Sequence, residues 1–144
     1  MNVKNKQKGL AAVELIIGLP VLMLFLVAVI EIARIYVEMN TLNKAVRVGA
    51  RYAMSVSEMS GCGPVMNEQG DIKQLVVYGT LEAGAAARID SLTTNDVTVS
   101  CENNQFVTVT ASHTFVPLFR DTLPNSELSL ALPMNATTVM RLDP

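Results

Sequence analysis

The sequence predicts an α+β protein in which one long N-terminal helix, membrane-spanning in its first half and amphipathic in its second, packs on a small antiparallel β-sheet. Three observations predict this fold. An apolar run lies near the start, a helical spacing of apolar residues continues beyond it, and alternating segments occupy the second half of the chain. With 144 residues, the chain has room for one modest domain and an appendage.

The apolar run extends from Leu10 to Ile30, and Glu14 is its only charged residue. At 1.5 Å per residue this segment would form a helix roughly 32 Å long, enough to cross the hydrocarbon core of a bilayer. Lys4, Lys6 and Lys8 precede the run and no acid offsets them, so the positive-inside rule places the N-terminus in the cytoplasm and the rest outside. A cleaved secretory signal is the alternative, although its apolar core is usually shorter.

Helical periodicity continues past the apolar run, with apolar residues at spacings of three and four and polar residues on the opposite face. The apolar face consists of Ile32, Ile35, Tyr36, Met39, Leu42, Val46, Gly49 and Ala53. Because no breaker lies between Val21 and Val48, we predict one helix from about Leu10 to about Ser55, with the sheet on its amphipathic face. Pro20 is the one strong interruption, and it predicts a kink near Gly18 and Leu19.

The segment after the helix begins as a loop, because Ser57 to Asp71 is rich in Gly and Pro residues. Ile72 to Tyr78 is a short apolar run that predicts a strand. Gly79 to Ala87 is rich in Ala and Gly and could be helix or loop.

The C-terminal part predicts the rest of the sheet, three or four strands in all. Asp96 to Cys101 and Gln105 to Val116 form strands joined by a hairpin turn at Cys101 to Gln105, and Pro117 ends the second of them. Leu118 to Asn125 is expected to be a loop or a helical turn. Glu127 to Met140 predicts a further strand, in which Pro133 marks a bulge or an edge.

Two cysteines, Cys62 and Cys101, indicate one disulfide if this part of the chain lies outside the cytoplasm. The chain-entropy model gives such a bond about 4 kcal/mol of stabilisation. Two buried free thiols are the alternative.

The composition and the motifs speak against catalysis and nucleic-acid binding. A net charge of −2 provides no basic face for a nucleic acid. His113 is the only histidine, and a single histidine within a strand is usually a structural or surface residue. Two cysteines and one histidine complete no metal site, and no nucleophile, zinc-binding or phosphate-loop motif occurs. We therefore predict no catalytic residue, no metal and no cofactor.

Glu14 raises the main question, since an ionised carboxylate in hydrocarbon costs at least a few kcal/mol. It could lie near the cytoplasmic interface and reach lipid headgroups. Alternatively, cleavage between Gly9 and Leu10 would create an α-ammonium at Leu10, and Glu14 would be the fifth residue of the processed chain. In a bundle of such helices, Glu14 of one chain could pair with the Leu10 amine of another, which would also fix the axial register.

The segment KGLAAVE, from Lys8 to Glu14, together with the apolar helix after it, resembles the processing site of type IV prepilins. More narrowly, the chain resembles the TadE-like minor pseudopilins of the tight-adherence (Flp, type IVb) pilus system. The resemblance is carried by Ala11 to Ala53, with its RVGARYA ending, and by three later segments. These are LVVYG (Leu75 to Gly79), VTVTASHTFVPL (Val107 to Leu118) and ATTVMR (Ala136 to Arg141).

This resemblance implies a pilin-like fold and a substrate rather than an enzyme. It divides the chain into a leader (residues 1–9), a transmembrane and assembly segment (10–30) and an extracytoplasmic pilin-like domain (31–144). It implies a minor pilin that starts or caps assembly of a pilus used in adhesion and biofilm formation, at the inner membrane and then on the pilus or cell surface. The implied partners are a prepilin peptidase, major and minor pilins, the inner-membrane assembly platform and membrane lipid.

One departure from the family pattern is Leu15, where the family more often has an aromatic residue after the glutamate. The competing function is an uncleaved single-span membrane protein whose outer domain binds a ligand or a surface. In that case residues 1–9 would be retained and Glu14 would have no assembly role.

Overall fold

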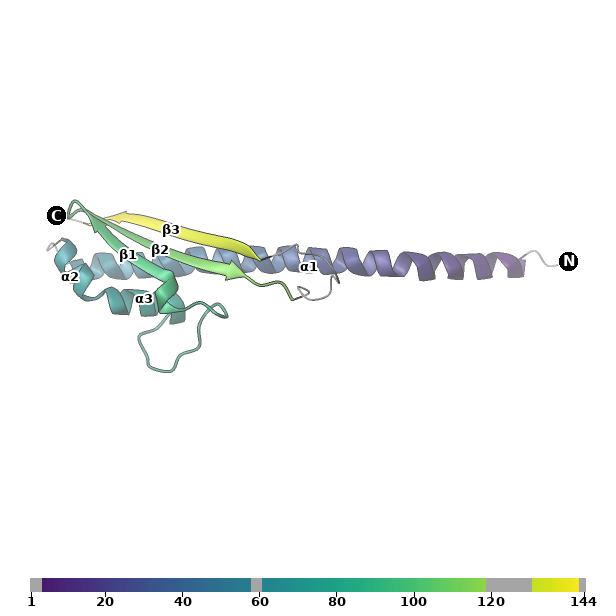
Figure 1. The fold of residues 1–144 in the computed structure, drawn as a ribbon, viewed down its shortest axis with the longest axis horizontal. Helices are drawn as coiled ribbons and strands as arrows, with labels where there is room; N and C mark the ends of the chain where they lie inside the picture. The colour runs from purple at the N-terminus through teal and green to yellow at the C-terminus, as the bar shows by residue number, and fades with distance from the viewer. Residues whose placement is uncertain (1–3, 58–60, 119–130, 143–144) are drawn as a thin grey trace. The chain divides into compact units, whose positions relative to one another are not determined.

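The computed structural model describes residues 4–57, 61–118 and 131–142, and Figure 1 shows their arrangement. The elements in chain order are α1 (Lys4–Ser57), α2 (Cys62–Asn67), α3 (Gln69–Tyr78), a 3-10 turn η1 (Thr94–Asp96), β1 (Val97–Glu102), β2 (Phe106–Phe115) and β3 (Leu132–Arg141). The chain divides into two compact units, Met1–Ile35 and Tyr36–Pro144, which are described separately below. The predicted α+β class, a long helix with a small antiparallel sheet, is confirmed.

Helix α1 is longer at both ends than the sequence predicted. It begins at Lys4 rather than Leu10 and ends at Ser57 rather than Ser55. Lysine is a good helix former, and no Gly or Pro precedes Gly9, so helical backbone continues through residues 4–9. Pro20 lies inside the helix, and the helical assignment continues through it; the kink expected there stays a prediction.

The sheet has the order β1-β2-β3, and both strand pairs are antiparallel. The predicted hairpin between β1 and β2 is confirmed. Asn103 and Asn104 occupy its tip with φ angles of 52° and 57°, a left-handed conformation that asparagine tolerates. The turn is closed by a 3.0 Å hydrogen bond that the N–H of Gln105 donates to the carbonyl of Glu102.

The prediction of a strand at Ile72 to Tyr78 was wrong, because this segment lies in helix α3. The preceding segment, expected to be a loop, contains α2 and the first turn of α3. Ile72 and Val76 are four residues apart and share the buried face of α3. The signals of a helix are present at its ends: Asp71 lies in the first turn, and Gly79 is a left-handed C-cap with φ 76°.

Within the second unit, the sheet and α3 lie along the C-terminal part of α1 (Figure 1). The predicted apolar face of α1 is confirmed at Leu42, Val46, Gly49 and Ala53, which are all buried. The prediction that this face is buried was wrong at Tyr36, which is 72% exposed. It was also wrong at Ile32 in the first unit, which is exposed. The apolar face that is buried therefore begins later in α1 than periodicity predicted. The sheet and its flank contribute the other large core side chains, namely Val97, Val107, Val109, Phe115 and Leu142.

Glycine 49 allows helices α1 and α3 to approach closely. A Cβ atom at this position would lie 2.5 Å from Cγ2 of Val76 and 3.4 Å from the carbonyl oxygen of Ile72. A side chain of any size would therefore push α3 away from α1.

The remaining connections agree with the sequence where the structure describes them. Gly79 to Ala87 forms bends and turns without helix or strand. Strand β3 begins at Leu132, and Pro133 lies in an edge strand as predicted. The expected loop or turn after Leu118 falls almost entirely outside the described residues, as does the start of the strand predicted from Glu127.

Candidate functional site

The first unit presents an apolar surface that no other part of the described chain covers. Large side chains along it are about half to two-thirds exposed, for example Ile16 at 71%, Leu22 at 64% and Phe25 at 69%. Among the described residues, Ala11–Ser57 is the one helix whose length and composition would allow it to cross a membrane. Such a surface needs lipid or other apolar helices around it.

The residues predicted for processing and pairing all lie in this helix. The backbone at Gly9 and Leu10 is helical, and Glu14 follows one turn later. The Glu14 side chain is exposed among exposed apolar neighbours. Cleavage and charge pairing themselves stay predictions.

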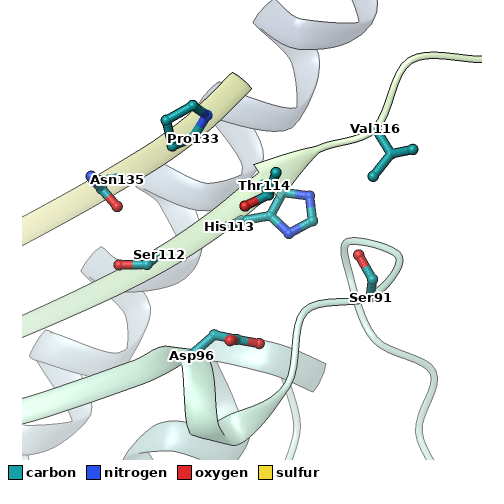
Figure 2. A pocket seen from close by; sticks show the side chains of 8 residues that line it. All are labelled: Ser91, Asp96, Ser112, His113, Thr114, Val116, Pro133 and Asn135. Atoms are coloured by element: carbon teal, nitrogen blue, oxygen red, sulfur yellow. The ribbon is translucent and has the colours of Figure 1, made fainter. Parts of the chain in front are cut away.

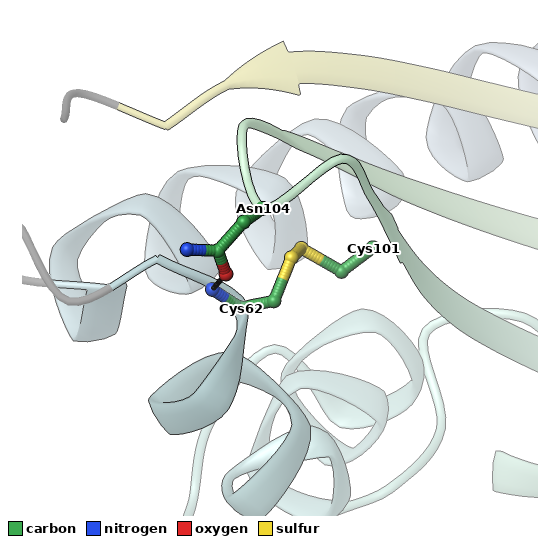
Figure 3. The surroundings of a disulfide bond; sticks show 3 residues. All are labelled: Cys62, Cys101 and Asn104. Carbon is green, nitrogen blue, oxygen red and sulfur yellow. Dashed lines mark hydrogen bonds between the residues drawn. A yellow bond between two sulfur atoms is a disulfide. The ribbon is translucent and has the colours of Figure 1, made fainter.

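The predicted disulfide is present in the second unit. Cys62 and Cys101 are bonded, with their Cα atoms 5.8 Å apart and a separation of 39 positions in sequence. The bond joins the first residue of α2 to β1 (Figure 3). Beside it, the backbone N–H of Cys62 donates a 2.7 Å hydrogen bond to Oδ1 of Asn104 at the tip of the hairpin. Two contacts thus hold α2 against the β1–β2 hairpin.

His113 has a structural position, as its place in a predicted strand indicated. Its side chain is 5% exposed, and Nε2 lies 3.4 Å from Oε2 of Glu38. This contact links β2 to the second-unit part of α1. No sequence pattern predicted this contact, since the two residues are far apart in the chain.

A pocket of about 370 Å³ lies at the end of the sheet where β2 and β3 continue beyond β1 (Figure 2). It is lined by Ser91, Asp96, Ser112, His113, Thr114, Val116, Pro133 and Asn135. The lining combines hydroxyl, amide, imidazole and carboxylate side chains with the apolar Val116 and Pro133. No three potential metal-binding side chains come together in the part of the chain that the structure describes.

Asp96 is held in place by Thr93, one turn earlier. Its Oδ2 accepts hydrogen bonds from the Thr93 hydroxyl (2.7 Å) and from the Thr93 N–H (2.8 Å). The hydroxyl bond and then the backbone bond lower the pKa of Asp96, and the nearby His113 adds to this effect. The Thr-x-x-Asp spacing is a capping-box pattern that the sequence could have revealed.

Tyr52, on α1, lies near the acidic residues at the start of α3. Burial raises the pKa of its phenol, and the carboxylates of Asp71 and Glu68 raise it further. Tyr52, Asp71 and Glu68 are not among the residues that line the pocket.

The fold and the exposed helix together suggest a membrane-anchored protein with a small α+β second unit. Residues 9–51 match the family model described as TadE-like protein. The match confirms the resemblance found in the sequence: over its N-terminal helix the chain is TadE-like, which relates it to the tight-adherence pilus system. No curated protein and no solved structure is significantly similar to the chain.

Proposed function

We propose that this protein is a minor pilin of a tight-adherence pilus, anchored in the inner membrane by the first half of α1 and processed by a prepilin peptidase between Gly9 and Leu10. The observation that supports it most directly is the exposed apolar surface of the first unit, with Glu14 one turn after the proposed cleavage site. The TadE-like match covers this same segment. In this function the chain is a substrate and a structural subunit, and it catalyses nothing.

Processing gives Glu14 a role in assembly. An α-ammonium on Leu10 is the cation that the Glu14 carboxylate of a neighbouring subunit would neutralise in a dry helix bundle. Removing one member of such a buried pair leaves the other uncompensated, at a cost of roughly 3–5 kcal/mol. The pair therefore selects one stagger between neighbouring helices.

The scissile bond lies within helical backbone, and this adds a requirement to the proposal. A protease binds its substrate with the backbone extended, so the first turns of α1 have to unwind before cleavage. Gly9 lowers this cost, since glycine is about 1 kcal/mol less favourable than alanine in a helix. Helix ends also open more readily than helix centres.

The experiment that tests processing is N-terminal sequencing of the full-length protein isolated from its native membrane. We expect the mature chain to begin at Leu10. The variant Gly9→Ser should accumulate as the unprocessed precursor. Gly18→Ser is the matched control, because Gly18 lies in the same helix and has open space around it; it should be processed normally. A mature chain that begins at Met1 would contradict the proposal.

The pairing role is tested separately with Glu14→Gln, which keeps the shape of the side chain and removes its charge. We expect normal processing but loss of co-purification with the other pilins of the system. Undiminished co-purification of this variant would show that Glu14 does not pair subunits.

The pocket beside His113 favours a second candidate, an uncleaved single-span protein whose outer unit binds a polar ligand. It predicts that residues 1–9 are retained in the mature protein. The same N-terminal sequencing separates the two functions.

A further inference from the structure

Three basic residues form an exposed surface on the second-unit part of helix α1, which we call the basic face. Its members are Lys44, Arg47 and Arg51, and all three are exposed. Spacings of three and four residues place them on one side of the helix, over about 10 Å of its axis. The buried face of α1 described above, which packs on α3 and the sheet, lies on the opposite side of the helix.

The basic face has no partner of opposite charge within the part of the chain that the structure describes. None of the ion pairs there includes Lys44, Arg47 or Arg51. No Asp or Glu lies three or four residues before or after any of them, and like charges at these spacings destabilise a helix. By contrast, Arg34 of the same helix is paired with Glu31, three residues earlier, at 3.3 Å.

The helix dipole does not account for the basic face either. Cations are stabilised near the C-terminus of a helix, but the effect falls off beyond the last turn. Helix α1 ends at Ser57, and its last turn contains no basic residue. Arg51, the nearest of the three cations, lies more than one turn before that end, and Lys44 lies more than three turns before it. These charges therefore add nothing evident to the stability of the helix that carries them.

The acidic residues described in the second unit lie on the other side of α1. Apart from Glu38, which contacts His113 of β2, they belong to α3, to the connections on either side of it and to β1. Helix α3 touches the buried face of α1 at Gly49. These acids are Glu68, Asp71, Glu82, Asp90, Asp96 and Glu102. Within the described chain they too are in no ion pair.

We propose that the basic face is a docking surface for a second copy of this chain, and that it binds the acidic segments of that copy. Charge complementarity defines this occupant. The chain carries both halves of such an interface, on opposite sides of α1, and neither half is neutralised within the described residues. Complementary charges across an interface speed the encounter of the partners and fix their register.

The proposed contact is heterologous, because it joins two different surfaces of the same chain. Each copy therefore keeps one free surface of each kind, and further copies can add in the same direction. This inference goes beyond the function proposed above and is independent of cleavage at Gly9 and of pairing by Glu14. All of its residues lie in the second unit, so either proposal can fail without the other.

Lys44 allows a direct test, because a lysine amine can be joined to a carboxylate that it touches. A carbodiimide activates the carboxylate, the amine displaces the activating group as a urea, and the amide that forms contains no spacer. Full-length protein is prepared with ordinary nitrogen and with heavy nitrogen, and the two forms are mixed in micelles of a zwitterionic detergent. After crosslinking and digestion, mass spectrometry selects the peptides that join one isotope to the other, since these form only between copies.

We expect such mixed-isotope crosslinks from Lys44 to one or more of the exposed acids Glu68, Glu82, Asp90 and Glu102. Lys73, which lies on α3 among the acids, is the comparison lysine and should give none. The yield at Lys44 should fall about tenfold in 1 M salt, where the screening length is about 3 Å. Absence of mixed-isotope crosslinks at Lys44, an equal yield at Lys73, or a yield unaffected by salt would each overturn the proposal.

Charge reversal separates the basic face from the net charge of the protein. Arg47→Glu should lower the yield at Lys44 about tenfold, because it replaces attraction with repulsion at the centre of the face. Arg141→Glu makes the same change of charge at an exposed position at the end of β3, and it should leave the yield unchanged. Thermal unfolding of both variants verifies that they fold. Equal yields at Lys44 in the two folded variants would contradict docking through the basic face.

Discussion

The two ends of helix α1 use similar residues for different purposes. Leu22, in the first unit, is 64% exposed, whereas Leu42, in the second unit, is fully buried. Both are leucines of one helix; Leu22 has apolar neighbours in sequence, whereas Leu42 lies between Thr41 and Asn43. The comparison shows that an apolar helix surface has two environments in this chain: the second-unit part packs on its own α3 and sheet, and the first-unit part is exposed in the described structure.

The buried and the exposed leucine should differ most in how much their truncation lowers the free energy of unfolding. Leu42→Ala should lower the free energy of unfolding of the second unit by about 2–5 kcal/mol, because it leaves a cavity in the core. Leu22→Ala, its matched control, should change that free energy by less than about 0.5 kcal/mol. Urea unfolding of the full-length protein in detergent micelles, followed by tyrosine fluorescence, measures both. Equal losses of unfolding free energy in the two variants would mean that the first-unit surface also stabilises the second unit.

The disulfide should affect the stability of the second unit alone, because both cysteines lie in that unit. Replacing Cys62 and Cys101 together by serine should lower the free energy of unfolding by about 2–4 kcal/mol. The wild-type protein in reductant should unfold at the same urea concentration as this double variant. If the reduced protein kept its original stability, the bond would be dispensable for the fold.

Close packing of α1 on α3 gives a smaller effect. Gly49→Ala should cost about 1–3 kcal/mol, because its Cβ would overlap Val76. Gly70→Ala is the control within α3, where the new Cβ would meet nothing within 4 Å, and it should be neutral or stabilise by up to about 1 kcal/mol. Thermal unfolding of the three proteins tests this. A tolerated Gly49→Ala would mean that α3 can move away from α1 without loss.

The smallest expected effect depends on pH. The folded-state pKa of Asp96 lies below its ordinary value of 3.8 because of the Thr93 hydrogen bonds. Their contribution is thus fully present above the unfolded pKa and is lost as the pH falls through the folded pKa. Thr93→Ala should cost about 0.5–1 kcal/mol at neutral pH, and less once the pH is well below about 4. The unfolding free energies of the wild type and of Thr93→Ala should converge as the pH falls through this range. A difference that does not depend on pH would show that the Asp96 carboxylate is not the source of the effect.

Much of the fold followed from local patterns in the sequence. Uninterrupted periodicity predicted α1, alternation predicted β1 and β2, and the Cys62–Cys101 pair followed from two cysteines in an outer domain. The strand assigned to IKQLVVY was wrong because a short apolar run is compatible with either period, and packing against Gly49 decides in favour of a helix. Periodicity also could not reveal that Tyr36 is exposed, since that depends on where the sheet ends.

The processing and pairing residues, which stay predictions, also rest on local features of the sequence. Gly9, Leu10 and Glu14 stand out because a basic leader, a glycine and one acid within an apolar run are all local features. The contact between Glu38 and His113 joins residues far apart in sequence, and no local pattern marks either one. The strand order could not be predicted either, because which strand lies at an edge is a property of the assembled sheet.

The disulfide has a further consequence for how the protein responds to proteases. Cys62 and Cys101 enclose α2, α3 and the whole connection from Gly79 to Thr93, which contains no helix or strand. A single peptide-bond cut within that connection would leave both fragments covalently joined. Such a nicked molecule would migrate as one band on a non-reducing gel and as two after reduction, so the part of the chain after the cut would stay attached to α1.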